Sequence, residues 1–216
     1  MKIFSKLLLV SGAACVVFPA QALPLAKNDA SVTASALTLK VASDKAIKGA
    51  ESFIGSMTKR GIDFLGNENM TKERQKEEFK KLLNDSFDMR TIGRFSLGRY
   101  WRTASTTQQK EYLSLFRAMI LNVYSARFSE YKGQALEVTS ARAEGKSDVL
   151  VTSIIKGNGD PEVQVDWRVR YKNGHYKVID IVVEGVSMGL TQRSDFASVI
   201  QRGGGNIDVL LEHLRK

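Results

Sequence analysis

After Gly133 the spacing of apolar residues changes from the helical period of 3.6 to the strand period of 2. The third segment is the clearest: its odd-numbered residues from Val163 to Tyr171 are apolar, and its even-numbered residues are polar or charged. One face of the predicted sheet is therefore buried, and the other faces water. Four segments follow this pattern in the region, and they are residues 136–143, 148–156, 163–171 and 176–184.

The connections between these segments determine how the strands pair. They read "EGKS", "GNGD" and "KNGH", and Asn173-Gly174 is a dipeptide that supplies the two positive φ angles of a two-residue hairpin. Connections this short join only antiparallel neighbours, because parallel strands require a long crossover. The sequence therefore predicts a four-stranded antiparallel meander.

Helical spacing of apolar residues precedes the sheet. Predicted helices begin at Lys45, run from Thr71 to Phe87 and from Asp88 to Leu97, and begin again at Thr106, which forms a capping-box pair with Gln109. The last of these presents the widest apolar stripe, formed by Leu113, Phe116, Ile120, Val123, Tyr124, Phe128 and Tyr131.

Two further helices are predicted after the sheet, one over residues 193–202 and one capped by Asn206. The fold class is α+β, with helices before and after one antiparallel sheet. The apolar faces of these helices must be buried, and we expect them to pack against the buried face of the sheet.

The N-terminus has the three parts of a cleavable secretory signal. Lys2 and Lys6 precede an apolar stretch from Leu7 to Phe18, and Ala20-Gln-Ala22 closes in the A-x-A form. The stretch is shorter than the roughly 20 residues of a membrane span. We expect residues 1–22 to be a signal peptide cleaved near Ala22, residues 23–43 a flexible lead-in, and residues 44–216 a single domain of an exported protein.

Composition restricts the chemistry of the exported chain. The only cysteine of the sequence, Cys15, lies in the signal segment and is lost on cleavage. Loss of Lys2 and Lys6 with the same segment reduces the formal net charge from +9 to +7. Export excludes nucleic acid as a partner, whereas a basic surface suits anionic lipid head groups, phosphate-bearing ligands or acidic protein surfaces. Simple solubility is the alternative role for this charge. We expect a monomer without cofactor or metal.

Two short motifs resemble a catalytic site and a nucleotide-binding site, but each lacks the structural context that such a site requires. Gly185-Val-Ser187-Met-Gly189 has the G-x-S-x-G form of a hydrolase elbow, but that elbow tops a parallel sheet and needs a downstream histidine. Gly145-Lys-Ser147 has the end of a phosphate-binding loop, but Ser140 stands where the motif needs glycine. We expect Ser187 to cap a helix and Gly145 to lie in a hairpin turn.

A basic and aromatic segment, "FDMRTIGRFSLGRYWR", spans residues 87–102. Arginine side chains bind phosphate oxygens, and tyrosine and tryptophan rings suit the boundary between oil and water. Such a cluster can hold a phosphate at the rim of an apolar cavity. A helix corner with surface arginines and a core tryptophan is the alternative.

The same segment, the four strands and "VIDIVVEGVSM" at residues 178–188 resemble the MlaC family of periplasmic phospholipid-binding proteins, also called the toluene-tolerance family. The resemblance implies a curved sheet and helices that enclose a cavity for acyl chains, with the head group near its mouth. It also implies partnership with an inner-membrane ABC transporter complex and an outer-membrane lipoprotein complex.

This resemblance, taken with the apolar faces, leads to two sets of expected site residues. The predicted lipid-tail cavity comprises Phe116, Ile120, Val123, Val151, Val165, Trp167, Val169, Val178 and Val182. The predicted head-group rim comprises Arg99, Tyr100, Trp101 and Arg193. The expected function is a non-enzymatic carrier of phospholipid between membrane complexes. A hopanoid carrier, or an adaptor domain with a filled core, is the alternative.

Overall fold

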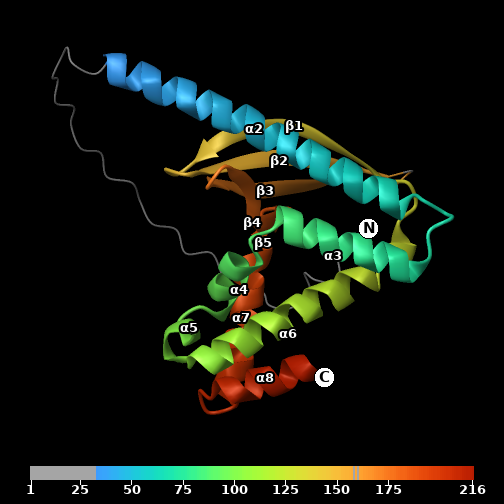
Figure 1. Cartoon of the computed structure of the whole chain (residues 1–216), viewed down its shortest axis with the longest axis vertical. Helices are drawn as coiled ribbons and strands as arrows, with labels where there is room; N and C mark the ends of the chain where they lie inside the picture. The colour runs from blue at the N-terminus through green and yellow to red at the C-terminus, as the bar shows by residue number, and fades with distance from the viewer. Residues whose placement is uncertain (1–32, 158, 160) are drawn as a thin grey trace.

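The computed structural model describes residues 33–216 apart from residues 158 and 160. The expected signal peptide and the first part of the expected lead-in lie outside these residues. The fold is α+β, as predicted, with an antiparallel sheet at one end of the molecule and a group of helices at the other (Figure 1).

The sheet is a meander of five strands in the order β1-β2-β3-β4-β5. Asn173 and Gly174 have φ angles of 52° and 82°, so the β3–β4 hairpin has the predicted two-residue turn. The strands are β1 (Ala135–Glu144), β2 (Asp148–Lys156), β3 (Val163–Lys172), β4 (His175–Val183) and β5 (Val186–Ser187).

The short strand β5 goes beyond the four predicted strands, the last of which ends at Glu184. Glu184 and Gly185 have φ angles of 49° and 79° and form a second tight turn. The turn brings Val186 opposite Val183 and so adds a fifth strand to the edge of the sheet.

Strand β4 contains a bulge that changes which residues face the helices. Arg168 of β3 pairs with Asp180, but the next residue, Val169, pairs with Val178, so Ile179 is an extra residue in β4. An extra residue reverses the alternation of a strand beyond it. The even-numbered residues of β4 were expected to face the helices. This expectation is correct at Val178 and wrong at Val182.

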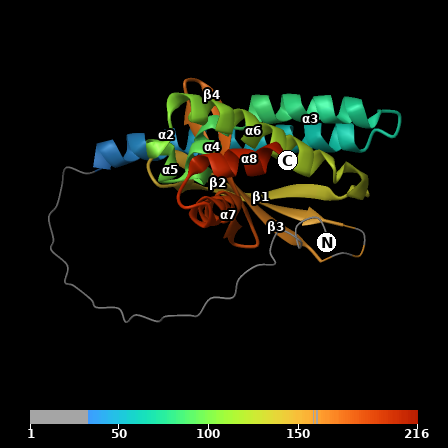
Figure 2. The ribbon, with the colours of Figure 1, turned by 90° about the horizontal axis from the view of Figure 1, so that it is seen from below.

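Helix α2 (Thr33–Leu65) begins well before the predicted start at Lys45. The part of the expected lead-in from Thr33 onward is thus helical, and residues 33–44 contain three alanines and two leucines and neither glycine nor proline. Helix α2 lies along the sheet, and α3 (Lys72–Ser86) lies beside it (Figure 2). The predicted cap of α3 is confirmed, since the Thr71 side chain accepts a hydrogen bond from Arg74 N.

Three helical segments connect α3 to the sheet. They are α4 (Met89–Leu97), the short α5 (Tyr100–Thr103) and α6 (Thr106–Ser125), with a 3-10 turn, η1 (Phe128–Glu130), at the end of α6. The capping box of α6 is formed by Ser105 and Gln108, one residue before the predicted pair, because Ser105 holds the extended conformation of an N-cap residue.

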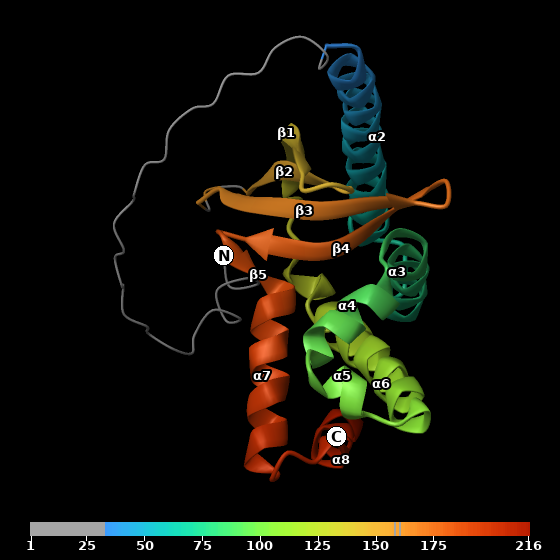
Figure 3. The ribbon, with the colours of Figure 1, turned by 90° about the vertical axis from the view of Figure 1, so that its left-hand side faces the viewer.

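Two helices follow the sheet, as predicted. Helix α7 (Met188–Arg202) begins earlier than expected because the Ser187 side chain caps it by accepting a hydrogen bond from Leu190 N. Helix α8 (Ile207–Arg215) begins after Asn206, whose side chain accepts from Asp208 N. In Figure 3, α7 runs away from β5, and α8 lies farthest from the sheet.

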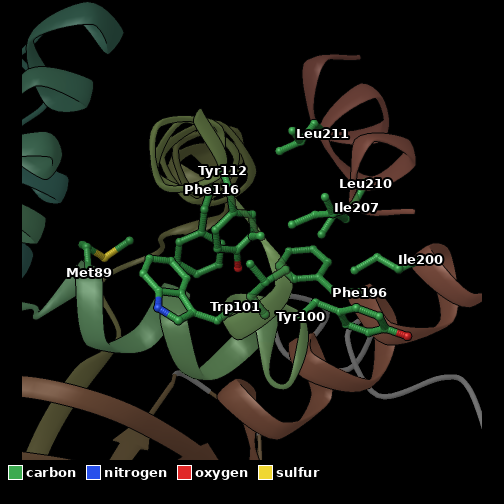
Figure 4. Packing of buried hydrophobic residues seen from close by; sticks show 12 residues of the cluster. Met89, Tyr100, Trp101, Tyr112, Phe116, Phe196, Ile200, Ile207, Leu210 and Leu211 are labelled. Carbon is green, nitrogen blue, oxygen red and sulfur yellow. The ribbon is translucent and has the colours of Figure 1, made fainter. Parts of the chain in front are cut away.

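The buried side chains form two separate cores. The sheet core joins α2 and α3 to one face of the sheet and contains Ala50, Ile54, Met57, Phe64, Leu82, Val149, Val151, Val169 and Val178. The helical core joins α4 to α8 and contains Tyr100, Trp101, Tyr112, Phe116, Phe196, Ile200, Leu210 and Leu211, among others (Figure 4). The expectation that the sheet covers all apolar helix surface is therefore wrong, because α6, α7 and α8 bury apolar side chains against one another.

Within the part of the chain that the structure describes, no helix has a stretch long and apolar enough to cross a bilayer.

Candidate functional site

A cavity of about 530 Å³ lies between the sheet core and the helical core. Its volume is within the range of ligand pockets. It borders both cores, since Met57 and Leu82 of the sheet core and Met89 and Phe116 of the helical core all line it. The space therefore lies between the two cores, and Phe87, which packs against both, is part of its wall.

Helices supply most of the apolar wall. Helix α6 contributes successive turns of one face with Phe116, Met119, Ile120 and Val123. A helix repeats every 3.6 residues, so this spacing turns all four side chains toward the cavity. The remaining apolar helix residues in the wall include Met57, Ile62, Phe64 and Leu65 of α2, Phe79, Leu82 and Leu83 of α3, Met89 and Ile92 of α4, and Met188 of α7.

Strands β3 and β4 form the opposite wall with Val165, Trp167, Ile181 and Val183. The Trp167 indole N–H donates to Ser153 Oγ at 2.9 Å, and that hydroxyl donates to the Val165 carbonyl at 3.0 Å. The polar atom of the tryptophan is thus satisfied within the sheet, and its ring can line an apolar cavity without leaving a donor unpaired.

Five of the nine residues expected in the lipid-tail cavity line the observed cavity. They are Phe116, Ile120, Val123, Val165 and Trp167.

The other four lie elsewhere. Val151, Val169 and Val178 are on the expected face of the sheet, but they pack in the sheet core, where α2 fills the space above them. Val182 borders a shallow recess on the other face, because the bulge of β4 reverses its direction. Ile181 and Val183 face the cavity in place of Val182. The sequence signal for this reversal was Asp180, whose carboxylate falls among the even-numbered residues of β4 that were expected to be apolar.

The four residues expected at the head-group rim do not line the cavity. Tyr100 and Trp101 are buried in the helical core, where Figure 4 shows Trp101 beside Phe116. The Arg99 guanidinium donates to the Tyr100 hydroxyl at 3.0 Å, and Arg193 lies over the Phe95 ring at 5.6 Å. The alternative of a helix corner with a core tryptophan therefore describes the position of Trp101.

Ser187 has the helix-capping position predicted for it. Its hydroxyl donates to Asp180 Oδ2 at 2.6 Å and accepts from Leu190 N at 3.1 Å. His175 begins β4, whereas Ser187 pairs with Val182 near the end of that strand, so strand geometry separates the histidine and the serine by roughly 20 Å. The surroundings of a nucleophile elbow do not form here.

Few charged side chains line the cavity. Among the described residues of its wall, the only charged ones are Arg127, Asp180 and Asp195. Sequence reasoning did not select Arg127, although it follows Val123 by four residues and Tyr124 by three and so continues the apolar stripe of α6. A basic residue within that stripe was the available signal.

One buried polar atom of the wall lacks a partner. The Ser96 hydroxyl lines the cavity and has no hydrogen-bond partner within the described part of the chain. It lies on α4, on the side of the cavity near the first turn of α7.

Comparison with known proteins identifies related chains. The toluene tolerance protein ttg2D of Pseudomonas putida is 25% identical over 114 residues, which are 53% of each chain. The intermembrane phospholipid transport system binding protein MlaC of Haemophilus influenzae is 26% identical over 124 residues, which are 56% of this chain and 57% of that protein. The chain thus spans about half the length of the curated relatives it matches.

A solved structure has the same fold. It is that of the phospholipid-binding protein from Ralstonia solanacearum in complex with a phospholipid, with a TM-score of 0.67 and 22% identity over 77% of this chain and 94% of that one. The family model described as MlaC protein matches residues 56–216, a range that contains every described residue of the cavity wall. The chain therefore belongs to the MlaC family.

Proposed function

We propose that the chain carries a phospholipid in the periplasm, with the acyl chains in the cavity. The observation that carries the proposal is an open space of about 530 Å³ with a mainly apolar wall between two packed cores. Protein interiors are close-packed, and an apolar void of this size lowers stability unless a ligand fills it. The match to the MlaC family supports a lipid as that ligand.

The energetics of lipid transfer are consistent with a passive carrier. Two acyl chains hold about 30 methylenes, whose transfer from water at about 0.8 kcal/mol each contributes about 24 kcal/mol. That figure exceeds the practical limit of roughly 18–21 kcal/mol for noncovalent binding, so it does not appear as net affinity. A lipid that moves from a bilayer to this cavity exchanges one apolar environment for another. The direction of transport then comes from a partner that consumes ATP.

The partners proposed for the chain follow from its family. One relative is named as the binding protein of an intermembrane phospholipid transport system. We propose that this chain exchanges lipid with an ABC transporter complex of the inner membrane and a lipoprotein complex of the outer membrane. Its formal net charge, +9 for the full sequence and +7 without Lys2 and Lys6, suits acidic docking surfaces or anionic membranes.

Native mass spectrometry of the protein, expressed from the full chain and purified from the periplasm without detergent, tests the proposal. We expect a population heavier than the protein by the mass of one or more phospholipids, and the same lipids in an organic extract. Recovery of a hopanoid would change the ligand class. Recovery of no lipid would support the adaptor alternative and contradict the carrier.

A matched pair of variants links the bound lipid to the cavity. Val165 lines the cavity and is 1% exposed, whereas Val182 faces the other side of the same sheet. Val165→Trp places a large ring in the lipid space and should remove most of the bound lipid. Val182→Trp adds the same ring outside the cavity and should leave loading unchanged.

A further inference from the structure

The charged residues of the cavity wall lie at different ends of it. Phe116 packs beside α4 and α7 in the helical core, and Tyr124 follows two turns later on α6, roughly 12 Å further along the helix axis. Arg127 comes directly after the end of α6, beyond Tyr124. Asp180 and Asp195 lie on β4 and α7, near the Phe116 end.

Exposed residues line the cavity at both ends. Asp195 is exposed at the α7 end. Val123, with 40% of its surface exposed, and Ala135 are exposed lining residues at the other end. Access alone therefore does not determine the end at which a lipid head group lies, and the ends differ in which charged side chains line them.

The α7 end is unsuited to a phosphate. The first turn of a helix attracts anions, but the Asp180 carboxylate already occupies this one. Asp180 Oδ1 accepts from Gly189 N at 3.0 Å, and Oδ2 accepts from the Ser187 hydroxyl at 2.6 Å. A phosphate at this end would meet the negative charges of Asp180 and Asp195. The Ser96 hydroxyl nearby is a neutral donor and does not offset them.

The end beyond α6 combines a positive charge with amphipathic neighbours. Arg127 is half-buried, and Tyr124, Tyr131 and Gln134 line the cavity beside it along the chain. Burial raises the pKa of the Tyr124 phenol, and the charge of Arg127 opposes that shift, so the guanidinium lies near the phenol. The Gln134 amide is held in place because its Oε1 accepts from Lys132 N at 2.8 Å. Arginine and tyrosine in this arrangement suit a phosphate at an apolar boundary.

We propose that Arg127 binds the phosphate of the carried phospholipid, so that the acyl chains run along α6 from Tyr124 toward Phe116. The proposal rests on the proposed function, since it assigns a direction to the lipid in the same cavity. It replaces Arg99 and Arg193, which do not line the cavity and contact Tyr100 and Phe95 instead.

A competition between two lipids tests this assignment. Wild-type protein and R127Q, both stripped of lipid, are incubated with vesicles of equal parts phosphatidylglycerol and diacylglycerol that have the same acyl chains. The ratio of the two lipids bound to the recovered protein is then measured. We expect R127Q to lower the ratio of phosphatidylglycerol to diacylglycerol about tenfold, because one charge-assisted contact to the phosphate is lost. R99Q and R193Q are the controls and should keep the wild-type ratio.

The outcomes separate this inference from the proposed function. Binding of neither lipid by the wild-type protein would contradict the carrier itself. Equal ratios for wild type and R127Q, with both loaded, would overturn the role of Arg127 alone. A structural role of Arg127 at the end of α6 would lower the amount of both lipids without changing their ratio, and would also overturn it.

Free phosphate is distinguished from a lipid phosphate in a further arm. The wild-type competition is repeated with excess inorganic phosphate at the ionic strength of the chloride control. We expect the ratio to stay the same, because only the lipid brings its phosphate with acyl chains that hold it at Arg127. A fall to the R127Q ratio would identify a general anion site and overturn the proposal.

Discussion

The Ser187 hydroxyl donates a hydrogen bond of 2.6 Å to Asp180 Oδ2 across the turn that joins β4 to β5. Oδ1 of the same carboxylate accepts from Ile181 N at 2.9 Å and from Gly189 N at 3.0 Å. One side chain thus ties the bulge of β4 to the first turn of α7, and this connection positions α7 beside the cavity.

Loss of this carboxylate should destabilise the fold more than loss of the serine. We expect Asp180→Ala to lower the free energy of unfolding by about 2–3 kcal/mol, because it removes hydrogen bonds to a charged group. Ser187→Ala should cost about 1 kcal/mol, the usual effect of losing an N-cap. The double variant should cost less than the sum, since the two residues contact each other. Urea denaturation measures all three.

The same serine variant tests the hydrolase interpretation of G-x-S-x-G. Capping predicts that Ser187→Ala changes stability and no reaction rate. An esterase activity that disappears in Ser187→Ala, with stability unchanged, would reverse the assignment.

Helix α2 packs so closely on the sheet that one of its glycines has no room for a side chain. A Cβ at Gly49 would lie 2.1 Å from the Tyr176 hydroxyl oxygen. We expect Gly49→Ala to reduce stability by about 1–3 kcal/mol through overpacking. Thermal or urea unfolding of the purified variant measures the loss.

Gly55 of the same helix provides the control, because a Cβ there meets nothing within 4 Å. Gly55→Ala should be neutral or stabilise the protein by up to about 1 kcal/mol, since alanine favours a helix. Equal effects of the two substitutions would mean that α2 does not pack on the sheet as described.

Local signals predicted much of the fold. The turn at Asn173-Gly174 and the caps at Thr71, Ser187 and Asn206 depend on a few neighbouring residues, and all of them occur as expected. Short-range chemistry of this kind is contained in the sequence of the turn or helix end itself.

The cavity wall was predicted less well, because it depends on long-range packing. Periodicity identified the apolar face of β3, but it did not tell that Val169 lies under α2 while Val165 borders open space. The bulge at Ile179 altered the phase of β4 and moved Val182 to the other face. Apolar residues that fill a core and those that line a void have the same pattern in the sequence.

This difference between filled and open space gives a stability test. Val151 is fully buried in the sheet core, whereas Val165 borders the cavity. We expect Val151→Trp to destabilise the lipid-free protein by about 1–3 kcal/mol or more, because the ring has no space. Val165→Trp should cost clearly less, because the ring enters the cavity. Comparable losses in urea denaturation would argue that the cavity is filled by side chains in solution.

Acid should weaken an ion pair network on the outer face of the sheet. Burial alone would raise the pKa of Asp148, but hydrogen bonds from Arg170 and Arg168 outweigh it and hold that pKa below its ordinary value. A lowered carboxyl pKa contributes stability above the unfolded-state pKa of about 3.9, and this contribution is lost as the pH falls toward the folded-state pKa.

Asp148→Asn should therefore destabilise the protein at neutral pH, by about 1–3 kcal/mol, and have a smaller effect at acid pH. The urea midpoints of the wild-type protein and of Asp148→Asn are compared between about pH 3 and pH 7. This range extends about one pH unit or more to each side of the carboxyl pKa. A constant difference across this range would mean that Asp148 is not the titrating group.

The two tryptophans of the chain test where the acyl chains of the proposed ligand lie. Trp167 lines the cavity, while Trp101 is 8% exposed and packs in the helical core, outside the cavity wall. Phospholipids brominated on their acyl chains quench tryptophan fluorescence by contact. We expect Trp101→Phe to keep strong quenching when such lipids are loaded, and Trp167→Phe to lose most of it. Each variant is compared with the same lipid without bromine, which removes effects of loading on the fold. Quenching that persists in Trp167→Phe and disappears in Trp101→Phe would place the acyl chains among α4 to α8 instead of against the sheet.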